Sequence, residues 1–125
     1  MARILVIDDD EELRETIRRA LERRGHEVEE ADEGGAGIDH LAQRSPDLVI
    51  TDIFMPGHDG IETLIELRKA FPKLAVIVMS GGDASGLLNL LDDAAMLGAN
   101  WTLPKPFTPD ELLHAVEYVL GRQAS

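Results

Sequence analysis

Two groups of acidic residues have the types and positions best suited to chemistry. Asp8 and Asp9 follow an apolar run at residues 4–7, and Asp52 follows a second apolar run at residues 48–50. Both runs read as strands buried on two faces. A buried strand has no structural need of a charge at its carboxyl end, where ligands of α/β sheets bind, so Asp52 is the first functional candidate.

Two further polar residues occupy similar positions. Ser80 follows an apolar run at residues 74–79, and Lys105 follows a weaker strand pattern at residues 100–103. Carboxylates packed together repel one another unless a cation joins them, and Mg2+ is a natural choice because it prefers oxygen ligands. A lysine ammonium and a serine hydroxyl can each hold a phosphoryl oxygen, and an aspartate can act as the nucleophile. The chemistry that this set predicts is phosphoryl transfer through an aspartyl-phosphate.

Alternating strand and helix patterns must position these side chains. Asp10 is expected to cap the first helix, and Thr108 with Glu111 forms a capping box for the last. Strands are predicted at residues 3–8, 27–31, 48–52, 74–79 and 100–103, and helices between 10 and 25, at 36–43, between 59 and 72, at 84–97 and from 108 to 120.

Five successive strand-helix units predict an α/β fold, a doubly wound, five-stranded parallel sheet with five helices. A common strand order for such a sheet is 2-1-3-4-5. The polar strand at residues 27–31 suits an edge of this sheet, where charge discourages pairing with another chain. The order brings all five candidate residues to one rim, with Asp8, Asp9 and Asp52 adjacent and Ser80 and Lys105 beside them.

Composition narrows the classes of function and location. A formal net charge of −12 argues against direct binding of nucleic acid, because phosphates would be repelled. The absence of cysteine excludes disulfides and thiolate metal sites, and a cytoplasmic location is the simplest expectation. No apolar run is long enough for a membrane span, and no signal-peptide pattern is visible. The four histidines, His26, His40, His58 and His114, lack metal-ligand spacing and are expected at the surface.

Taken in chain order, these motifs resemble the receiver domain of two-component response regulators. The resemblance covers essentially the whole chain, so it implies that residues 1–125 form one receiver domain with the flavodoxin-like (CheY-like) fold. It rests on Asp8-Asp9, on Asp52 with Met55-Pro56-Gly57 and Asp59-Gly60, on Ser80-Gly81, and on Lys105-Pro106-Phe107.

The resemblance also implies a role for each matching position. Asp52 would be phosphorylated, and Mg2+ would be held by Asp8, Asp9, Asp52 and the backbone carbonyl of Phe54. Ser80 and Lys105 would hold phosphoryl oxygens, and the peptide bond from Lys105 to Pro106 would be cis.

The partners follow from the resemblance in the same way. The donor would be a phosphohistidine on a sensor histidine kinase or a histidine phosphotransfer protein. The domain would catalyse its own phosphorylation and dephosphorylation only. An output domain or target protein would bind through the helix at residues 84–97, the strand at 100–103 and the last helix.

One departure from the family's pattern matters, and two alternatives stay open. The family usually has tyrosine or phenylalanine three residues before the lysine, where this chain has Thr102, and the neighbouring Trp101 would face the other side of the strand. A phosphorylation-independent interaction module is therefore one alternative. A phosphohydrolase is the other, but that class typically needs an aspartate two residues after its nucleophile, and Phe54 stands there.

Overall fold

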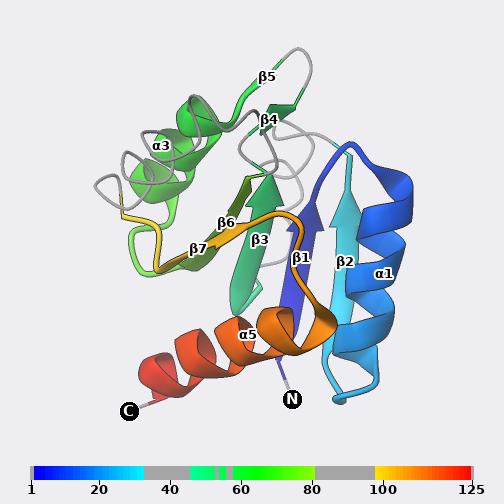
Figure 1. Ribbon diagram of the computed structural model, residues 1–125. Helices are drawn as coiled ribbons and strands as arrows, with labels where there is room; N and C mark the ends of the chain where they lie inside the picture. The colour runs from blue at the N-terminus through cyan, green and yellow to red at the C-terminus, as the bar shows by residue number, and fades with distance from the viewer. Residues whose placement is uncertain (1, 33–45, 53, 56–57, 81–97, 125) are drawn as a thin grey trace.

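The computed structural model describes residues 2–32, 46–52, 54–55, 58–80 and 98–124. A five-stranded parallel sheet lies at its centre, in the order β2-β1-β3-β6-β7 (Figure 1). This is the predicted 2-1-3-4-5 order, with the polar strand at one edge. The strands are β1 (Arg3–Ile7), β2 (Glu27–Ala31), β3 (Leu48–Asp52), β6 (Ala75–Ser80) and β7 (Trp101–Pro104).

Helices cover both faces of the sheet. Helices α1 (Glu11–Glu22) and α5 (Pro109–Ala124) pack on one face, and α3 (Gly60–Ala70) packs on the other. The helices predicted at residues 36–43 and 84–97 lie outside the described residues. In the part of the chain that the structure describes, every helix is too short or too polar to cross a lipid bilayer.

Alternation along the strands divides the core into two layers. In β1, Ile4 and Val6 pack toward α1 and α5, whereas Leu5 and Ile7 pack toward α3. All four are almost fully buried, and burying a side chain of this size stabilises the fold by roughly 1.5–3 kcal/mol. Both faces of the central strands are covered, which is why these strands appear in the sequence as continuous apolar runs.

The predicted helix caps are present. Asp10 accepts a hydrogen bond from the Leu13 N–H at 3.2 Å, so it caps α1. The Glu111 N–H donates to Thr108 Oγ1, and the Thr108 N–H donates to Glu111 Oε1, both at 3.1 Å. This reciprocal pair is the capping box expected at the start of α5.

A small ribbon was not predicted. After β3, the two-residue strands β4 (Phe54–Met55) and β5 (His58–Asp59) pair antiparallel just before α3 begins. Strands this short carry no periodic pattern that a sequence could reveal.

Candidate functional site

The site lies at the rim formed by the carboxyl ends of the strands. Asp52 is the last residue of β3, and Asp8 directly follows β1. The two strands are neighbours with Ile7 opposite Thr51, so their ends bring these acids together. Carboxylate oxygens of Asp8, Asp9 and Asp52 lie within 4.8 Å of one another. The predicted convergence of the three acids is therefore present.

The three acids differ in exposure. Asp8 is completely buried and Asp52 is 4% exposed, whereas Asp9 is exposed. Burial disfavours the charged form, so it raises the pKa of Asp8 above its usual value. The Asp10 N–H, which donates to Asp8 Oδ1 at 2.8 Å, and the Lys105 ammonium oppose this rise in pKa.

Lys105 directly follows the edge strand β7 and reaches the acid cluster along the same rim of the sheet. Its Nζ donates to Asp8 Oδ2 at 3.0 Å and to Asp52 Oδ2 at 3.1 Å, and its side chain is 20% exposed. Burial lowers the pKa of Lys105, but the two carboxylates outweigh burial and the pKa is raised overall. The ammonium is thus charged and placed between the two buried acids.

Ser80 and Phe54 are placed by their backbones. Ser80 ends β6 beside Pro104 of β7, and Phe54 begins β4 two residues after Asp52. The side chains of both residues lie outside what the structure describes. The peptide bond between Lys105 and Pro106 is cis, as the resemblance implied.

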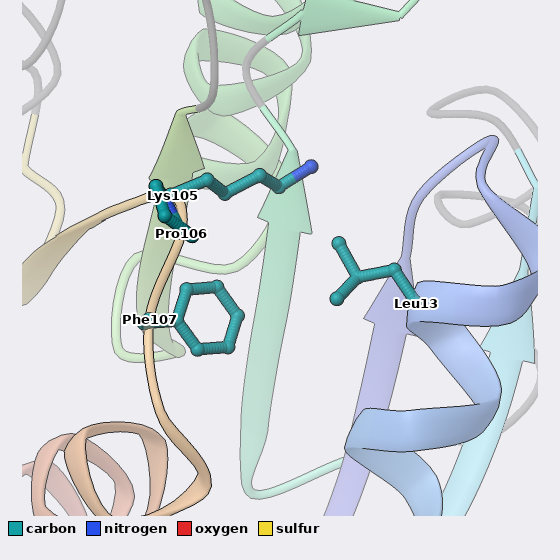
Figure 2. Close-up of a pocket in the computed structure, with 4 residues that line it drawn as sticks. All are labelled: Leu13, Lys105, Pro106 and Phe107. Atoms are coloured by element: carbon teal, nitrogen blue, oxygen red, sulfur yellow. The ribbon is translucent and has the colours of Figure 1, made fainter.

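A pocket opens beside Lys105. It has a volume of about 370 Å³ and is lined by Leu13, Lys105, Pro106 and Phe107. Figure 2 shows Leu13, from the first turn of α1, and the Phe107 ring on opposite sides of the opening, with the lysine chain extending toward the tip of β3. Apolar side chains therefore stand next to Lys105 at this opening. Leu13 was not predicted to lie at this pocket, because its spacing fits an ordinary core position.

Arg14 is a second residue that sequence reasoning missed. It lies off the apolar stripe of α1, which is typical of a solvent-facing residue, yet its side chain is only 14% exposed. Its Nη1 donates to the Asp8 carbonyl oxygen at 2.5 Å. A basic side chain within the first turns of a helix that follows an acidic loop is the signal that could have drawn attention to it.

Trp101, the aromatic residue next to Thr102, packs against α5. Trp101 makes edge contacts with Tyr118 and His114 of α5, at ring-centroid distances of 4.8 and 6.1 Å. Successive strand residues point to opposite faces, so Thr102 faces the α3 side. This agrees with the expectation that Trp101 cannot take the place of the missing aromatic residue.

The histidines are placed as far as the described residues allow. His114 is exposed, as predicted, whereas His26 is half-buried and accepts a hydrogen bond from the Ala2 N–H at 3.2 Å. His26 is thus less exposed than predicted, because it packs against the start of β1. His40 and the side chain of His58 lie outside the part of the chain that the structure describes.

The three acids fit a small, hard cation. Octahedral Mg2+ holds oxygen ligands at about 2.1 Å, so opposite ligands stand about 4 Å apart. The carboxylate oxygens, within 4.8 Å of one another, need only a small approach to reach such a shell. The cluster can therefore hold a divalent metal with oxygen ligands.

A doubly wound five-stranded sheet with three acids and a lysine at the carboxyl ends of its strands defines the class, a flavodoxin-like α/β domain with a metal-compatible acid cluster. Residues 4–117 match the model of the response regulator receiver domain, and the chain belongs to that family. It is the receiver domain of a response regulator in two-component signalling. The comparisons give no support to a phosphorylation-independent module.

Curated relatives and solved structures agree with this assignment. The response regulator MprA of Mycobacterium sp. (strain KMS) is 39% identical over 120 residues, which are 96% of this chain and 51% of that protein. The chain thus spans about half the length of the curated relatives it matches. The receiver domain of NtrX from Brucella abortus is 32% identical with a TM-score of 0.88, covering 94% of this chain and 98% of that one. A receiver domain protein from Clostridium thermocellum is 35% identical with a TM-score of 0.89, covering 99% and 98%.

Proposed function

We propose that Asp52 accepts a phosphoryl group. The observation that supports this proposal best is the Lys105 ammonium, which lies within hydrogen-bond distance of the carboxylates of both Asp8 and Asp52. In the reaction, an Asp52 carboxylate oxygen attacks the phosphorus of a phosphohistidine. An O–P bond forms, the N–P bond breaks, and the imidazole leaves with the electron pair of that bond and takes up a proton. Lys105 and Ser80 hold oxygens of the transferred group.

The metal expected in this reaction is Mg2+. Asp8, Asp9, Asp52 and the Phe54 carbonyl would hold it, and when bound it would supply positive charge to the phosphoryl oxygens. The buried position of Asp8 and Asp52 strengthens any such interaction, because charges attract more strongly where water is excluded.

The donor is a sensor histidine kinase or a histidine phosphotransfer protein. The pocket of Leu13, Pro106 and Phe107 supports this, because its apolar walls adjoin Lys105, whose ammonium would meet the phosphoryl group. A donor surface that is apolar around its phosphohistidine fits this arrangement. The reaction is confined to the domain's own phosphorylation and dephosphorylation, and it takes place in the cytoplasm.

The phosphorylated domain then acts on an output domain or a target protein. We assign this contact to residues 84–97, β7 and α5, and we treat residues 1–125 as one receiver domain. The response regulator MprA and the receiver-containing protein NtrX are both longer than this chain, which is consistent with an output domain elsewhere. Direct nucleic-acid binding or membrane insertion by this domain is not part of the proposal.

The test is phosphorylation with a small donor. The protein is incubated with Mg2+ and acetyl phosphate, and the adduct is followed by intact mass. The wild type should gain one acid-stable, base-labile phosphoryl group, and Asp52→Asn should gain none. Asp47→Asn is the control, because Asp47 is an exposed acid at the opposite end of β3 and should label normally. Labelling that persists in Asp52→Asn would disprove the assignment.

A further inference from the structure

Arg14 connects the edge strand of the sheet to the loop that carries two of the acids. Its Nε donates to Glu30 Oε1 of β2 at 3.2 Å, and its Nη1 donates to the carbonyl oxygen of Asp8 at 2.5 Å. The side chains of Arg14 and Glu30 are 14% and 25% exposed. A planar guanidinium held at two points is restrained in both direction and rotation.

The carbonyl that Arg14 contacts belongs to the peptide that links Asp8 to Asp9. The neighbouring groups of this loop are fixed separately, because the Asp8 N–H donates to the Ala31 carbonyl at 3.1 Å and the Asp10 N–H donates to Asp8 Oδ1 at 2.8 Å. The Arg14 bond fixes the orientation of the linking peptide itself. The orientation of this peptide sets the direction in which the Asp9 side chain leaves the backbone, and so the positions that its carboxylate can reach.

We propose that Arg14 is a positioning residue for the metal site, holding the peptide between Asp8 and Asp9 so that both carboxylates face the same cation as Asp52. The inference rests on the proposed function, because it assigns a task within that site. The printed contacts of Arg14 are with Glu30 and the Asp8 carbonyl, so in this role it would contact neither the metal nor the phosphoryl group directly. It acts on them through the backbone of Asp8.

Electrostatics alone predicts the opposite effect of removing Arg14. A guanidinium near a cation site repels Mg2+, so losing its charge should tighten binding. Loss of positioning should weaken binding instead, and changes to groups that orient metal ligands typically cost about 10–100-fold in affinity. The direction of the change therefore separates the two explanations.

Arg18 provides a matched control. It lies one turn further along α1, carries the same charge and donates to Glu30 Oε2 at 3.0 Å, but its contacts are with Glu30 and Glu22. The variants Arg14→Met and Arg18→Met therefore remove the same charge and the same type of Glu30 contact. They differ in the bond to the Asp8 carbonyl.

The experiment measures Mg2+ affinity by isothermal titration calorimetry and the Mg2+ dependence of phosphorylation by acetyl phosphate. For Arg14→Met we expect a dissociation constant raised about tenfold, with a rate at saturating Mg2+ close to that of the wild type. For Arg18→Met we expect a dissociation constant for Mg2+ that is equal to or lower than that of the wild type. A purely structural loss would lower the amplitude of binding and leave the half-saturating Mg2+ concentration unchanged. Equal constants for the two variants, or tighter binding by Arg14→Met, would overturn the proposal.

A second pair of variants guards against misfolding. If circular dichroism shows that Arg14→Met does not fold, the pair Arg14→Lys and Arg18→Lys is used instead. These variants keep the charge, while a single ammonium replaces the two-point guanidinium contact. Arg14→Lys should then bind Mg2+ more weakly than Arg18→Lys, and equal affinities would again overturn the proposal. If the wild type itself binds no Mg2+ and takes no label, the proposed function fails, which is a distinct result.

Discussion

Lys105 Nζ lies 3.1 Å from Oδ2 of Asp52, although the two residues are 53 positions apart along the chain. The same ammonium lies 3.0 Å from Asp8 Oδ2, so one cation bridges two buried carboxylates. In the metal-free protein the lysine offsets part of the repulsion between these acids. A bound divalent ion would share this task, so the stability of the fold and the occupancy of the site are coupled.

Replacing Lys105 should expose this coupling. In Lys105→Met, Asp8 and Asp52 lose their common partner while remaining buried, and we expect the free energy of unfolding without Mg2+ to fall by about 1–3 kcal/mol. Mg2+ should then stabilise the variant more than the wild type, because the ion replaces the missing positive charge. Urea unfolding with and without Mg2+ measures both effects.

Lys73→Met is the control for this change. Lys73 is exposed in the turn before β6, so its loss should alter the free energy of unfolding by less than about 0.5 kcal/mol. If Mg2+ stabilises the two variants equally, the Lys105 ammonium does not offset the repulsion between Asp8 and Asp52.

Asp8 should limit the stability of the metal-free protein. Its pKa is raised chiefly by burial, so at neutral pH its ionised form is less favourable in the folded than in the unfolded state. Asp8→Asn removes that charge, and its side-chain oxygen can still accept the Asp10 N–H. We expect an equal or higher melting temperature without Mg2+ and a smaller rise when Mg2+ is added, measured by scanning calorimetry.

The matched variant is Asp9→Asn. Asp9 is exposed, so removing its charge should give no comparable gain in the metal-free melting temperature while also reducing the response to Mg2+. If Asp8→Asn melts well below Asp9→Asn in the absence of Mg2+, the burial argument for Asp8 is wrong.

Much of the fold was readable from local signals. Continuous apolar runs predicted the central strands because both faces of a doubly wound sheet are covered, and the capping residues Asp10 and Thr108 marked two helix starts. The strand predicted from Leu74 begins instead at Ala75 and runs on to Ser80. The Leu74 N–H donates to the Phe71 carbonyl at 3.1 Å, so the turn after α3 keeps Leu74 out of the ladder.

Part of the site was also predictable from the sequence, and part was not. The convergence of Asp8, Asp9, Asp52 and Lys105 could be predicted, because each lies at or just after the carboxyl end of a strand and parallel strands end at one rim. The bond from Arg14 to the Asp8 carbonyl could not be predicted, because it depends on how α1 packs beside β2. Periodicity assigns such a side chain to solvent and carries no information on what lies next to it.

Gly98 should resist substitution more than another glycine of similar backbone conformation. Its φ is +103°, and a Cβ there would lie 3.0 Å from Arg68 Nε. Arg68 has little room to move, because its Nη2 donates to the Gly98 carbonyl at 2.5 Å and to Asn100 Oδ1 at 2.7 Å. Gly98→Ala should therefore lower the free energy of unfolding by about 2–3 kcal/mol, measured in urea.

Gly25→Ala isolates the backbone contribution. Gly25 has φ +88° with nothing within 4 Å of the added Cβ, so its substitution should cost about 1 kcal/mol. In an Arg68→Ala background the additional cost of Gly98→Ala should disappear. An additional cost that survives there would mean that the Arg68 side chain is not its source.

His26 should make the fold sensitive to mild acid. Burial lowers its pKa below the ordinary 6.5, and its Nδ1 accepts the Ala2 N–H, which only the unprotonated nitrogen can do. The folded state therefore binds fewer protons than the unfolded state between these two pKa values. The contribution of neutral His26 to the free energy of unfolding is fully present above pH 6.5 and falls as the pH decreases toward the folded-state pKa. Below that pKa, His26 causes no further decrease.

This dependence is tested by urea unfolding at a series of pH values from neutral to mildly acidic. His26→Gln should flatten the decline in the free energy of unfolding, because glutamine does not titrate. His114→Gln should leave the decline unchanged, since His114 is exposed on α5. Parallel curves for the wild type and His26→Gln would show that other groups cause the acid sensitivity. The site acids lie at the opposite ends of the strands from His26, so the change should leave Mg2+ binding at neutral pH as it is in the wild type.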